Sequence, residues 1–476
     1  MAGGRFREGS YRFLGFILLS VCVGVLILVW AVGPSAHGPR PRTRSPRGPN
    51  IVLILTDDQR YDSLHVMPEV RRLLVDEGMT FDRAIISDPL CCPSRSTILT
   101  GRYAHTTGVY SNGGPHGGWK VFRPSESSTI ATALHGAGYR TALIGKYLNG
   151  YGVSSDPYVP PGWDDWLAFS RGGPQYFDYT MYSSGERGNV AFGARPRDYS
   201  TDVIRRRAVS FIRGVPKSRP FFLMITPYAP HAGFIPAPRH EGDLAAAPVR
   251  LGPSVNEADV SDKPLHIRTQ DPEPAEVLRA RTREQWETLL AVDQLVGEVL
   301  AAVRDTGREG NTLVIFTSDN GFSNREHRWV GKLVPYEESI RVPLIIRFPG
   351  TIPAGVRSSA LVSNVDLAPT IADLAGVTLP MEGVSLRPLL TNSASSVRDE
   401  VVLEHKQWGN QVPTYCGVRT RGFVFAHYVT GEEELYDLVR DPWELKNVVS
   451  EMPAKATELR SLTESLCEPV PPGFSW

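Results

Sequence analysis

Short, continuous runs of apolar residues alternate with longer amphipathic segments along most of the chain. The first run, residues 51–55, reads Ile-Val-Leu-Ile-Leu, and similar runs follow at 221–225, 313–317 and 344–348. Such runs are typical of strands that are buried on both faces of a parallel sheet. Apolar positions with helical spacing lie between them, at 128–136, 202–212 and 281–304. Strands that alternate with helices predict an α/β fold with a large, mainly parallel sheet flanked by helices.

Two stretches, residues 151–200 and 232–274, show no sustained period. Long irregular insertions in a compact domain are typical of substrate-binding loops. Several aromatic residues of the first stretch could face a sugar, although large aromatic side chains more often pack in cores and we favour packing. These residues are Trp163, Trp166, Tyr176, Tyr179 and Tyr182.

A polar run at residues 391–396 separates two predicted parts of the chain. We expect a catalytic domain at 50–390 and a small C-terminal α+β subdomain at 397–476. In the subdomain, the pattern predicts short strands at 401–404 and 423–428 and a helix at 454–466.

The N-terminus contains an uncharged apolar stretch, residues 13–33, that is long enough to cross a bilayer as a helix. A basic segment, residues 1–12, precedes it, and the stretch is longer than the apolar core of an ordinary signal peptide. Pro34 directly follows the best small-residue pair for cleavage. We therefore expect a transmembrane signal anchor at 13–33, a Pro/Arg-rich linker at 34–49, and an exported protein that is anchored to the membrane. A cleaved signal and a secreted protein are the alternative.

Charge and cysteine content narrow the classes of partner. Acidic and basic residues balance at 51 each, so no overall field favours nucleic acid, and we expect no nucleic-acid partner. The five cysteines are too few for a disulfide scaffold. Cys416 and Cys467 could pair in an oxidising compartment, but the sequence does not fix their distance.

Polar pairs follow two of the buried strands. Asp57 and Asp58 come after the first strand, and Asp319 and Asn320 come after the strand at 313–317. The carboxyl ends of strands form the ligand crevice of an open α/β sheet. Carboxylates that are brought together need a cation, and oxygen donors suit Ca²⁺ or Mg²⁺. Each pair alone could cap a turn, but their shared position favours a metal site.

A cysteine motif, Cys91-Cys92-Pro93-Ser94-Arg95, continues to Thr100-Gly101. Proline suits the first turn of a helix and glycine its end, so residue 91 is expected at a helix N-terminus, where free N–H groups favour an anion. Arg95, one turn into the helix, would orient the reactive group or bind the ester. A plain thiolate nucleophile or redox centre at Cys91 is the alternative, and Cys92 is expected to be a small buried neighbour.

This motif resembles the signature of the type I, formylglycine-dependent sulfatases of the alkaline phosphatase superfamily. The resemblance covers about residues 50–450 and implies an alkaline phosphatase-like fold and hydrolysis of sulfate esters. It implies that a formylglycine-generating enzyme oxidises Cys91 to formylglycine. It also implies that this residue binds a cation, Ca²⁺ or Mg²⁺, together with Asp57, Asp58, Asp319 and Asn320.

Three further segments match the family. Lys146, in Gly145-Lys146, resembles the lysine that binds the sulfate group; His231 resembles an active-site histidine; and Lys332 resembles the second active-site lysine. The resemblance implies that hydrated formylglycine attacks sulfur and that Arg95, Lys146 and Lys332 offset charge on the sulfuryl oxygens. His231 or Lys332 would protonate the leaving alcohol.

Leu148 departs from the family pattern, because many sulfatases have a histidine there that is thought to act as a base. The subfamily that resembles N-acetylglucosamine-6-sulfatase also shows Gly-Lys-Tyr-Leu-Asn and Cys-Cys-Pro-Ser-Arg, so we interpret Leu148 as a subfamily trait. This implies 6-O-sulfated N-acetylglucosamine in glycosaminoglycan-like chains as the substrate. His105, His327 and Asn149 are the candidates for the base.

Three alternatives stay open. A phosphoester or phosphonate-ester hydrolase on the same scaffold would share the cysteine motif and the cation. A non-catalytic binder of sulfated glycans predicts lost metal ligands or a replaced nucleophile, and the sequence has neither change. Without the modifying enzyme, residue 91 would keep its thiol.

Overall fold

The computed structural model describes residues 48–153, 155–391, 396–409 and 412–476. The predicted basic segment at 1–12, the predicted anchor at 13–33 and all but the last two residues of the predicted linker at 34–49 lie outside the described residues. Within the described ranges, every helix is too short or too polar to cross a bilayer.

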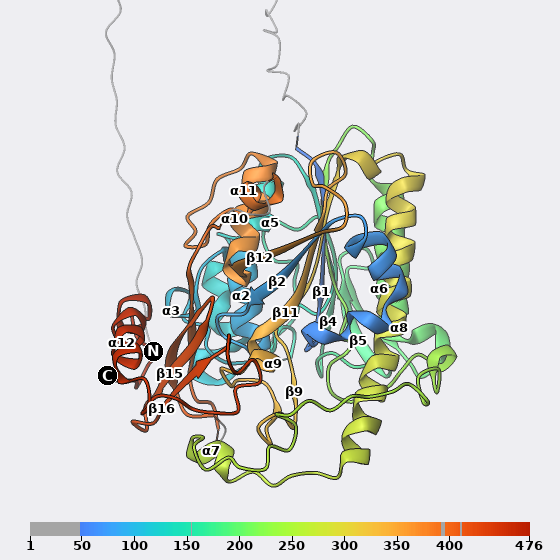
Figure 1. The fold of residues 1–476 in the computed structure, drawn as a ribbon. Coiled ribbons are helices and arrows are strands. Elements are labelled where there is room, and N and C mark those ends of the chain that lie inside the picture. Colours follow the sequence, from blue (N-terminus) through green and yellow to red (C-terminus); the bar gives the residue numbers. More distant parts are fainter. Residues whose placement is uncertain (1–47, 154, 392–395, 410–411) are drawn as a thin grey trace, which may run out of the picture. The chain divides into compact units, whose positions relative to one another are not determined.

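A ten-stranded sheet forms the centre of the fold (Figure 1). The five adjacent strands from β8 to β4 run parallel, whereas β11, β5 and β6 pair antiparallel with their neighbours. Strand β1 lies between β8 and β7 and is buried along its whole length. From one edge to the other, the strands are β12 (Val356–Ser363), β2 (Met79–Ile85), β11 (Arg341–Arg347), β8 (Thr312–Ser318), β1 (Asn50–Thr56), β7 (Phe221–Thr226), β3 (Arg140–Gly145), β4 (Asp165–Ser170), β5 (Tyr179–Ser183) and β6 (Gly188–Phe192).

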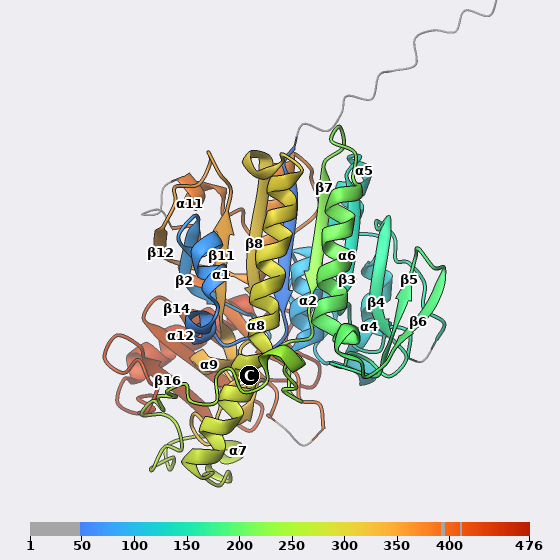
Figure 2. The same cartoon turned by 90° about the vertical axis from the view of Figure 1, so that its right-hand side faces the viewer.

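Helices cover both faces of this sheet, because the side chains of a strand point alternately to either side (Figure 2). Leu53 belongs to the core under α2 (Cys91–Thr100), α5 (Ile130–Gly136) and α10 (Leu367–Ala375). Ile54 belongs to the core under α6 (Ser200–Gly214) and α8 (Ala275–Asp305). Burial of each such side chain contributes about 2 kcal/mol to the stability of the fold. The central strands therefore hold the loops at their ends in fixed positions.

A second, four-stranded antiparallel sheet packs with one helix near the C-terminus. Its elements are β13 (Glu400–His405), β14 (Tyr415–Thr420), β15 (Phe423–Tyr428), β16 (Glu433–Asp437) and α12 (Pro453–Leu466). A disulfide joins Cys416 on β14 to Cys467, which follows α12. The remaining α-helices and strands are α1 (Pro68–Val70), α3 (Ala104–Thr107), α4 (Gly118–Phe122), α7 (Leu265–Arg268), β9 (Ser323–Asn324), β10 (Val330–Gly331), α9 (Glu337–Ile340) and α11 (Arg387–Thr391).

The predicted fold class is confirmed: a large, mainly parallel sheet is flanked by helices and accompanied by a small C-terminal α+β subdomain. One expectation is wrong. Residues 151–200 are not an irregular insertion, because β4, β5 and β6 extend the large sheet there. The strands are only five or six residues long and are separated by Gly-rich turns, so their alternation does not persist. Trp166, Tyr176 and Tyr179 are buried, as the packing interpretation predicted.

Candidate active site

Four neighbouring strands of the large sheet are followed by polar side chains at their carboxyl-terminal ends. Asp319 and Asn320 follow β8, and Asp57 and Asp58 follow β1. Thr56 pairs in register with Ser318, so Asp57 and Asp319 leave the sheet side by side. On the other side of β1, His231 comes from the loop after β7, and Lys146 directly follows β3. Because these strands run parallel, their carboxyl-terminal ends lie together, and residues that are far apart in the sequence meet there.

The first turn of helix α2 points at these strand ends. Cys91 is its first residue, Arg95 lies one turn later, and both are buried. The helix ends at Gly101, whose φ of 66° is a left-handed conformation that favours glycine. Cys91 therefore lies at a helix N-terminus, as predicted, where free N–H groups and the helix dipole favour an anion. Asn112, which no sequence signal marks, accepts the N–H of Cys92 at 2.9 Å and ties this turn to a neighbouring loop.

Carboxylates gather next to Cys91. The Cys91 thiol donates to Asp57 Oδ1 at 3.6 Å, and the backbone N–H of Asp58 donates to Asp319 Oδ1 at 3.1 Å. Asn320 Nδ2 donates to Asp58 Oδ1 at 2.7 Å, whereas the buried Asn320 Oδ1 has no hydrogen-bond partner among the described residues. Oxygen donors that are buried together, one of them without a partner, fit a hard divalent cation such as Ca²⁺ or Mg²⁺.

Three cationic side chains surround the carboxylates. Lys146 Nζ lies 2.5 Å from Asp57 Oδ2, and Arg95 Nε lies 2.7 Å from Asp319 Oδ2. Lys332, from the loop between β10 and α9, donates to Cys91 Sγ at 2.9 Å and also contacts Asp58 Oδ1. The charges of the three bases and the three carboxylates thus balance. A divalent cation would leave the site net positive, which suits an anionic ester.

The surroundings shift the pKa values of the acidic groups in opposite directions. Burial alone would raise the pKa of Asp57, but Lys146 and His231 more than offset it, so the pKa lies below its usual value. The pKa of Asp58 is lowered in the same way, against burial, mainly by Lys332. Burial raises the pKa of the Cys91 thiol even though Lys146 and Lys332 oppose the shift.

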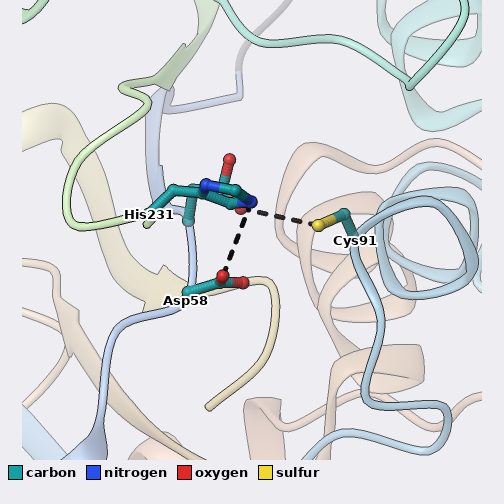
Figure 3. A group of neighbouring side chains, drawn as sticks. Asp58, Cys91 and His231 are labelled. Carbon is teal, nitrogen blue, oxygen red and sulfur yellow. Dashed lines mark hydrogen bonds and ion pairs between the residues drawn. The ribbon is translucent and has the colours of Figure 1, made fainter. Parts of the chain in front are cut away.

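His231 lies next to Asp58 and Cys91 (Figure 3). Its Nε2 is 3.6 Å from Asp58 Oδ2, and its ring stacks on Tyr228 with a centroid distance of 4.6 Å. The side chain of His231 is 28% exposed and that of Lys332 is 13% exposed, whereas Asp57 and Cys91 are fully buried. A ligand can therefore approach Cys91 from the side of His231 and Lys332.

Three residues are candidates for the general base that many sulfatases provide with a histidine at the position of Leu148. Each of them has a hydrogen-bond partner other than Cys91. His105 Nδ1 lies 3.0 Å from Glu404 Oε2, and His327 Nδ1 lies 2.7 Å from Glu257 Oε2. The backbone N–H of Asn149 donates to the sulfur of Cys92, the buried neighbour, at 3.1 Å. In the part of the chain that the structure describes, none of the three is hydrogen bonded to Cys91.

Known proteins resemble the chain in sequence and in fold. Residues 49–377 match the family described as Sulfatase, and residues 325–469 match the one described as N-sulphoglucosamine sulphohydrolase, C-terminal. The N-acetylglucosamine-6-sulfatase of Homo sapiens is 33% identical over 430 residues, which cover 87% of this chain and 76% of the relative. An extracellular sulfatase Sulf-1 homologue of Caenorhabditis elegans is 38% identical over 72% of this chain, which spans about half (49%) of that relative.

A solved structure agrees with these matches. It shows a protein in complex with its substrate D-glucosamine-2-N,6-O-disulfate. Its fold superposes on this chain with a TM-score of 0.77 at 28% sequence identity, over 89% of this chain and 98% of that one. The Sulfatase match covers more than half of the chain and includes Asp57, Cys91 and Asp319. The chain therefore belongs to the sulfatase family, whose members hydrolyse sulfate esters.

Proposed function

We propose that this chain removes the 6-O-sulfate group from N-acetylglucosamine residues of glycosaminoglycan-like chains. The observation that carries the proposal is the meeting of Cys91, three carboxylates and three bases at the N-terminus of α2. Support for the sugar comes from the N-acetylglucosamine-6-sulfatase relative and from the neighbour whose substrate carries a 6-O-sulfate.

Cys91 Sγ occupies the place of the formylglycine oxygen atoms in the active protein. A formylglycine-generating enzyme would act on the unfolded chain, because Cys91 is fully buried once the protein has folded. Asp57, Asp58, Asp319 and Asn320 would hold the cation, Ca²⁺ in preference to Mg²⁺, together with residue 91. Formylglycine and the cation, when present, would together supply the nucleophile for attack on sulfur.

The positively charged side chains of the site would bind and polarise the sulfate group. Lys146 contacts Asp57 and Lys332 contacts Cys91 from different segments of the chain, so both would lie near a sulfate held at residue 91. Arg95 holds Asp319 through Nε, while its Nη2 is buried without a hydrogen-bond partner among the described residues. These cations offset the negative charge that develops on the sulfuryl oxygens, and removal of one such donor typically costs a factor of about 10² to 10³ in rate.

His231 and Lys332 are placed to protonate the leaving sugar oxygen. Both line the open side of the site, where the sugar would lie, and both contact Asp58. His231 Nδ1 lies 3.2 Å from the carbonyl oxygen of Ala232, which favours the tautomer with its proton on Nδ1 when the ring is neutral. Protonation of Nε2 would then provide the acid on the side that faces Cys91 (Figure 3).

We propose that the protein works outside the cytoplasm. An uncleaved anchor at residues 13–33 and the linker at 34–49 would attach it to the membrane. The disulfide between Cys416 and Cys467 supports an oxidising compartment, because such bonds are rare in the cytosol. The extracellular sulfatase relative supports the same location. The domain boundaries of this proposal are 50–390 for the catalytic domain and 397–476 for the C-terminal subdomain.

The test compares three sulfated or phosphorylated substrates with the full-length chain and with Cys91→Ala. Peptide mass spectrometry around residue 91 first measures the fraction of formylglycine. We expect the modified chain to cleave 6-O-sulfated N-acetylglucosamine faster than N-sulfated glucosamine and faster than an aryl phosphate, and Cys91→Ala to be inactive.

Three outcomes would contradict the proposal. Preference for the N-sulfate would favour the activity named in the C-terminal family match. Preference for the phosphate would favour the phosphoester hydrolase. Full activity of Cys91→Ala would overturn the assignment of the nucleophile.

A further inference from the structure

A second group of buried ionisable side chains lies outside the candidate active site. It consists of His327 on the loop between β9 and β10, Glu338 in α9, and Glu444 in the segment after β16. One possible ligand atom of each residue lies within 4.8 Å of those of the other two. Their exposed fractions are 0%, 4% and 1%. Three ligating side chains from three different segments thus converge on one point inside the protein.

Each of the three residues has an atom without a partner. His327 Nε2, Glu338 Oε2 and Glu444 Oε1 are buried and have no hydrogen-bond partner in the described part of the chain. The other carboxylate oxygen of Glu444 accepts the backbone N–H of Glu337 at 2.9 Å, which fixes the orientation of this side chain. Buried polar atoms are nearly always paired, so three unpaired atoms on residues that lie this close together indicate a ligand common to all three.

The second ring nitrogen of His327 is held as it is in histidines that bind metal ions. Its Nδ1 lies 2.7 Å from Glu257 Oε2, and Lys263 Nζ lies 3.5 Å from the other oxygen of Glu257. The carboxylate keeps the proton on Nδ1, so Nε2 keeps a lone pair that is free to bind a metal ion. A carboxylate behind a histidine is the usual outer partner of an imidazole that binds zinc.

Charge balance also indicates a cation. The neighbouring carboxylates each have a basic partner: Glu326 with Arg60, Glu337 with Arg419, and Glu257 with Lys263. Glu338 and Glu444 have no ion pair among the described residues. One divalent ion would balance the charge of these two carboxylates.

We propose that His327, Glu338 and Glu444 bind one Zn²⁺ ion at a buried site that is separate from the active-site cation. One imidazole nitrogen and two carboxylate oxygens are a donor set that suits zinc, with a water molecule as the fourth ligand. A cavity of about 190 Å³ lies next to Glu338 and is lined by residues that also include Arg60 and Trp443. The proposal does not depend on the sulfate ester being the substrate.

The proposed metal site would hold in place the loop that carries Lys332 into the active site. Lys332 lies between His327 and Glu338 in the sequence, and Glu444 belongs to the C-terminal part of the chain. The N–H of Gly321, next to Asn320, donates to the carbonyl oxygen of Ser339, next to Glu338, at 2.9 Å. An ion held by the three residues would therefore fix the two ends of the Lys332 loop to each other and to the C-terminal segment.

Cobalt provides a direct measurement, because Co²⁺ replaces Zn²⁺ and absorbs visible light when it has four or five ligands. The full-length chain is stripped with a chelator, reloaded with Ca²⁺ and titrated with Co²⁺, and bound metal is counted by mass spectrometry. We expect one Co²⁺ per chain with strong visible bands, and its displacement by one equivalent of Zn²⁺. Glu444→Gln should weaken this binding at least about 100-fold.

Two controls separate this site from other metal binding. Asp319→Asn changes the active-site cluster and should keep the cobalt bands, and Glu451→Gln removes an exposed carboxylate of the same C-terminal segment and should also keep them. A wild-type chain that takes up no Co²⁺ beyond its Ca²⁺ would overturn the proposal, whatever the variants do. Bands lost in Asp319→Asn and kept in Glu444→Gln would overturn it as well.

Discussion

Lys332 Nζ lies 2.9 Å from Cys91 Sγ and contacts Asp58 Oδ1 at the same time. This lysine therefore joins the residue at the start of α2 to a carboxylate that follows β1. Burial opposes its charge, but Asp58 and the other acidic groups raise the pKa of Lys332 well above its usual value. The ammonium group is therefore charged at neutral pH, which suits it to offset negative charge next to residue 91.

Replacement of Lys332 by methionine keeps the length of the side chain and removes its charge. We expect kcat/KM for the sulfate ester to fall by a factor of about 10² to 10³, because a charge that stabilises the transition state is lost. The measurement is steady-state kinetics on protein with an equal formylglycine content. Lys446→Met, on an exposed lysine, is the matched control and should keep full activity. Activity within twofold of wild type in Lys332→Met would show that the lysine does not act on the sulfate group.

Replacement of Asp319 by asparagine keeps the shape of the side chain and removes one negative charge from the cluster. Arg95 then loses its ion pair at 2.7 Å, and the cation loses a charged ligand. We expect a Ca²⁺ affinity that is at least about tenfold weaker and a matching loss of activity. Calorimetric titration with Ca²⁺ measures the affinity, and activity at saturating Ca²⁺ measures how much is recovered. Unchanged Ca²⁺ binding would place the cation elsewhere.

The sequence predicted the fold class and the family because their signals are local. The apolar run of β1 marks a buried parallel strand, and Pro93 and Gly101 mark the two ends of α2. The closeness of Asp57 and Asp319 followed from the rule that parallel strands end at the same edge. The family match was confirmed, whereas the roles of the site residues stay predictions.

Other features of the molecule have no local signal. Strands β5 and β6 are short and lie at the edge of the sheet, where pairing with β4 rather than hydrophobic alternation decides the structure. The meeting of His327 with Glu444 depends on contacts between segments more than a hundred residues apart. The partners of His105 and His327 likewise arise from tertiary packing, so the sequence alone left both open as candidates for the base.

Loss of the disulfide should destabilise the C-terminal subdomain. Cys416 and Cys467 are 51 residues apart, and the chain entropy of closing a loop of this length corresponds to about 4 kcal/mol at 25 °C. We expect the double variant Cys416→Ser and Cys467→Ser to have a correspondingly smaller free energy of unfolding in denaturant titrations. Added reductant should lower the stability of the wild type and leave the double variant unchanged. Equal stability of the two proteins under oxidising conditions would contradict the expectation.

Acid should destabilise the protein in part through His266. Burial lowers the pKa of this histidine from 6.5 to about 4, and its ring packs against Trp329 and Tyr428. Between these two pKa values the unfolded chain binds a proton that the folded chain does not, so stability is full above pH 6.5 and falls as the pH falls towards 4. The loss from this group between pH 6.5 and pH 5 is about 2 kcal/mol.

The variant His266→Phe keeps an aromatic ring in this position and removes the proton-binding site. Its free energy of unfolding should therefore fall by about 2 kcal/mol less than that of the wild type over the same pH range. Parallel pH profiles for the wild type and His266→Phe would mean that His266 takes up its proton in the folded state as readily as in the unfolded chain.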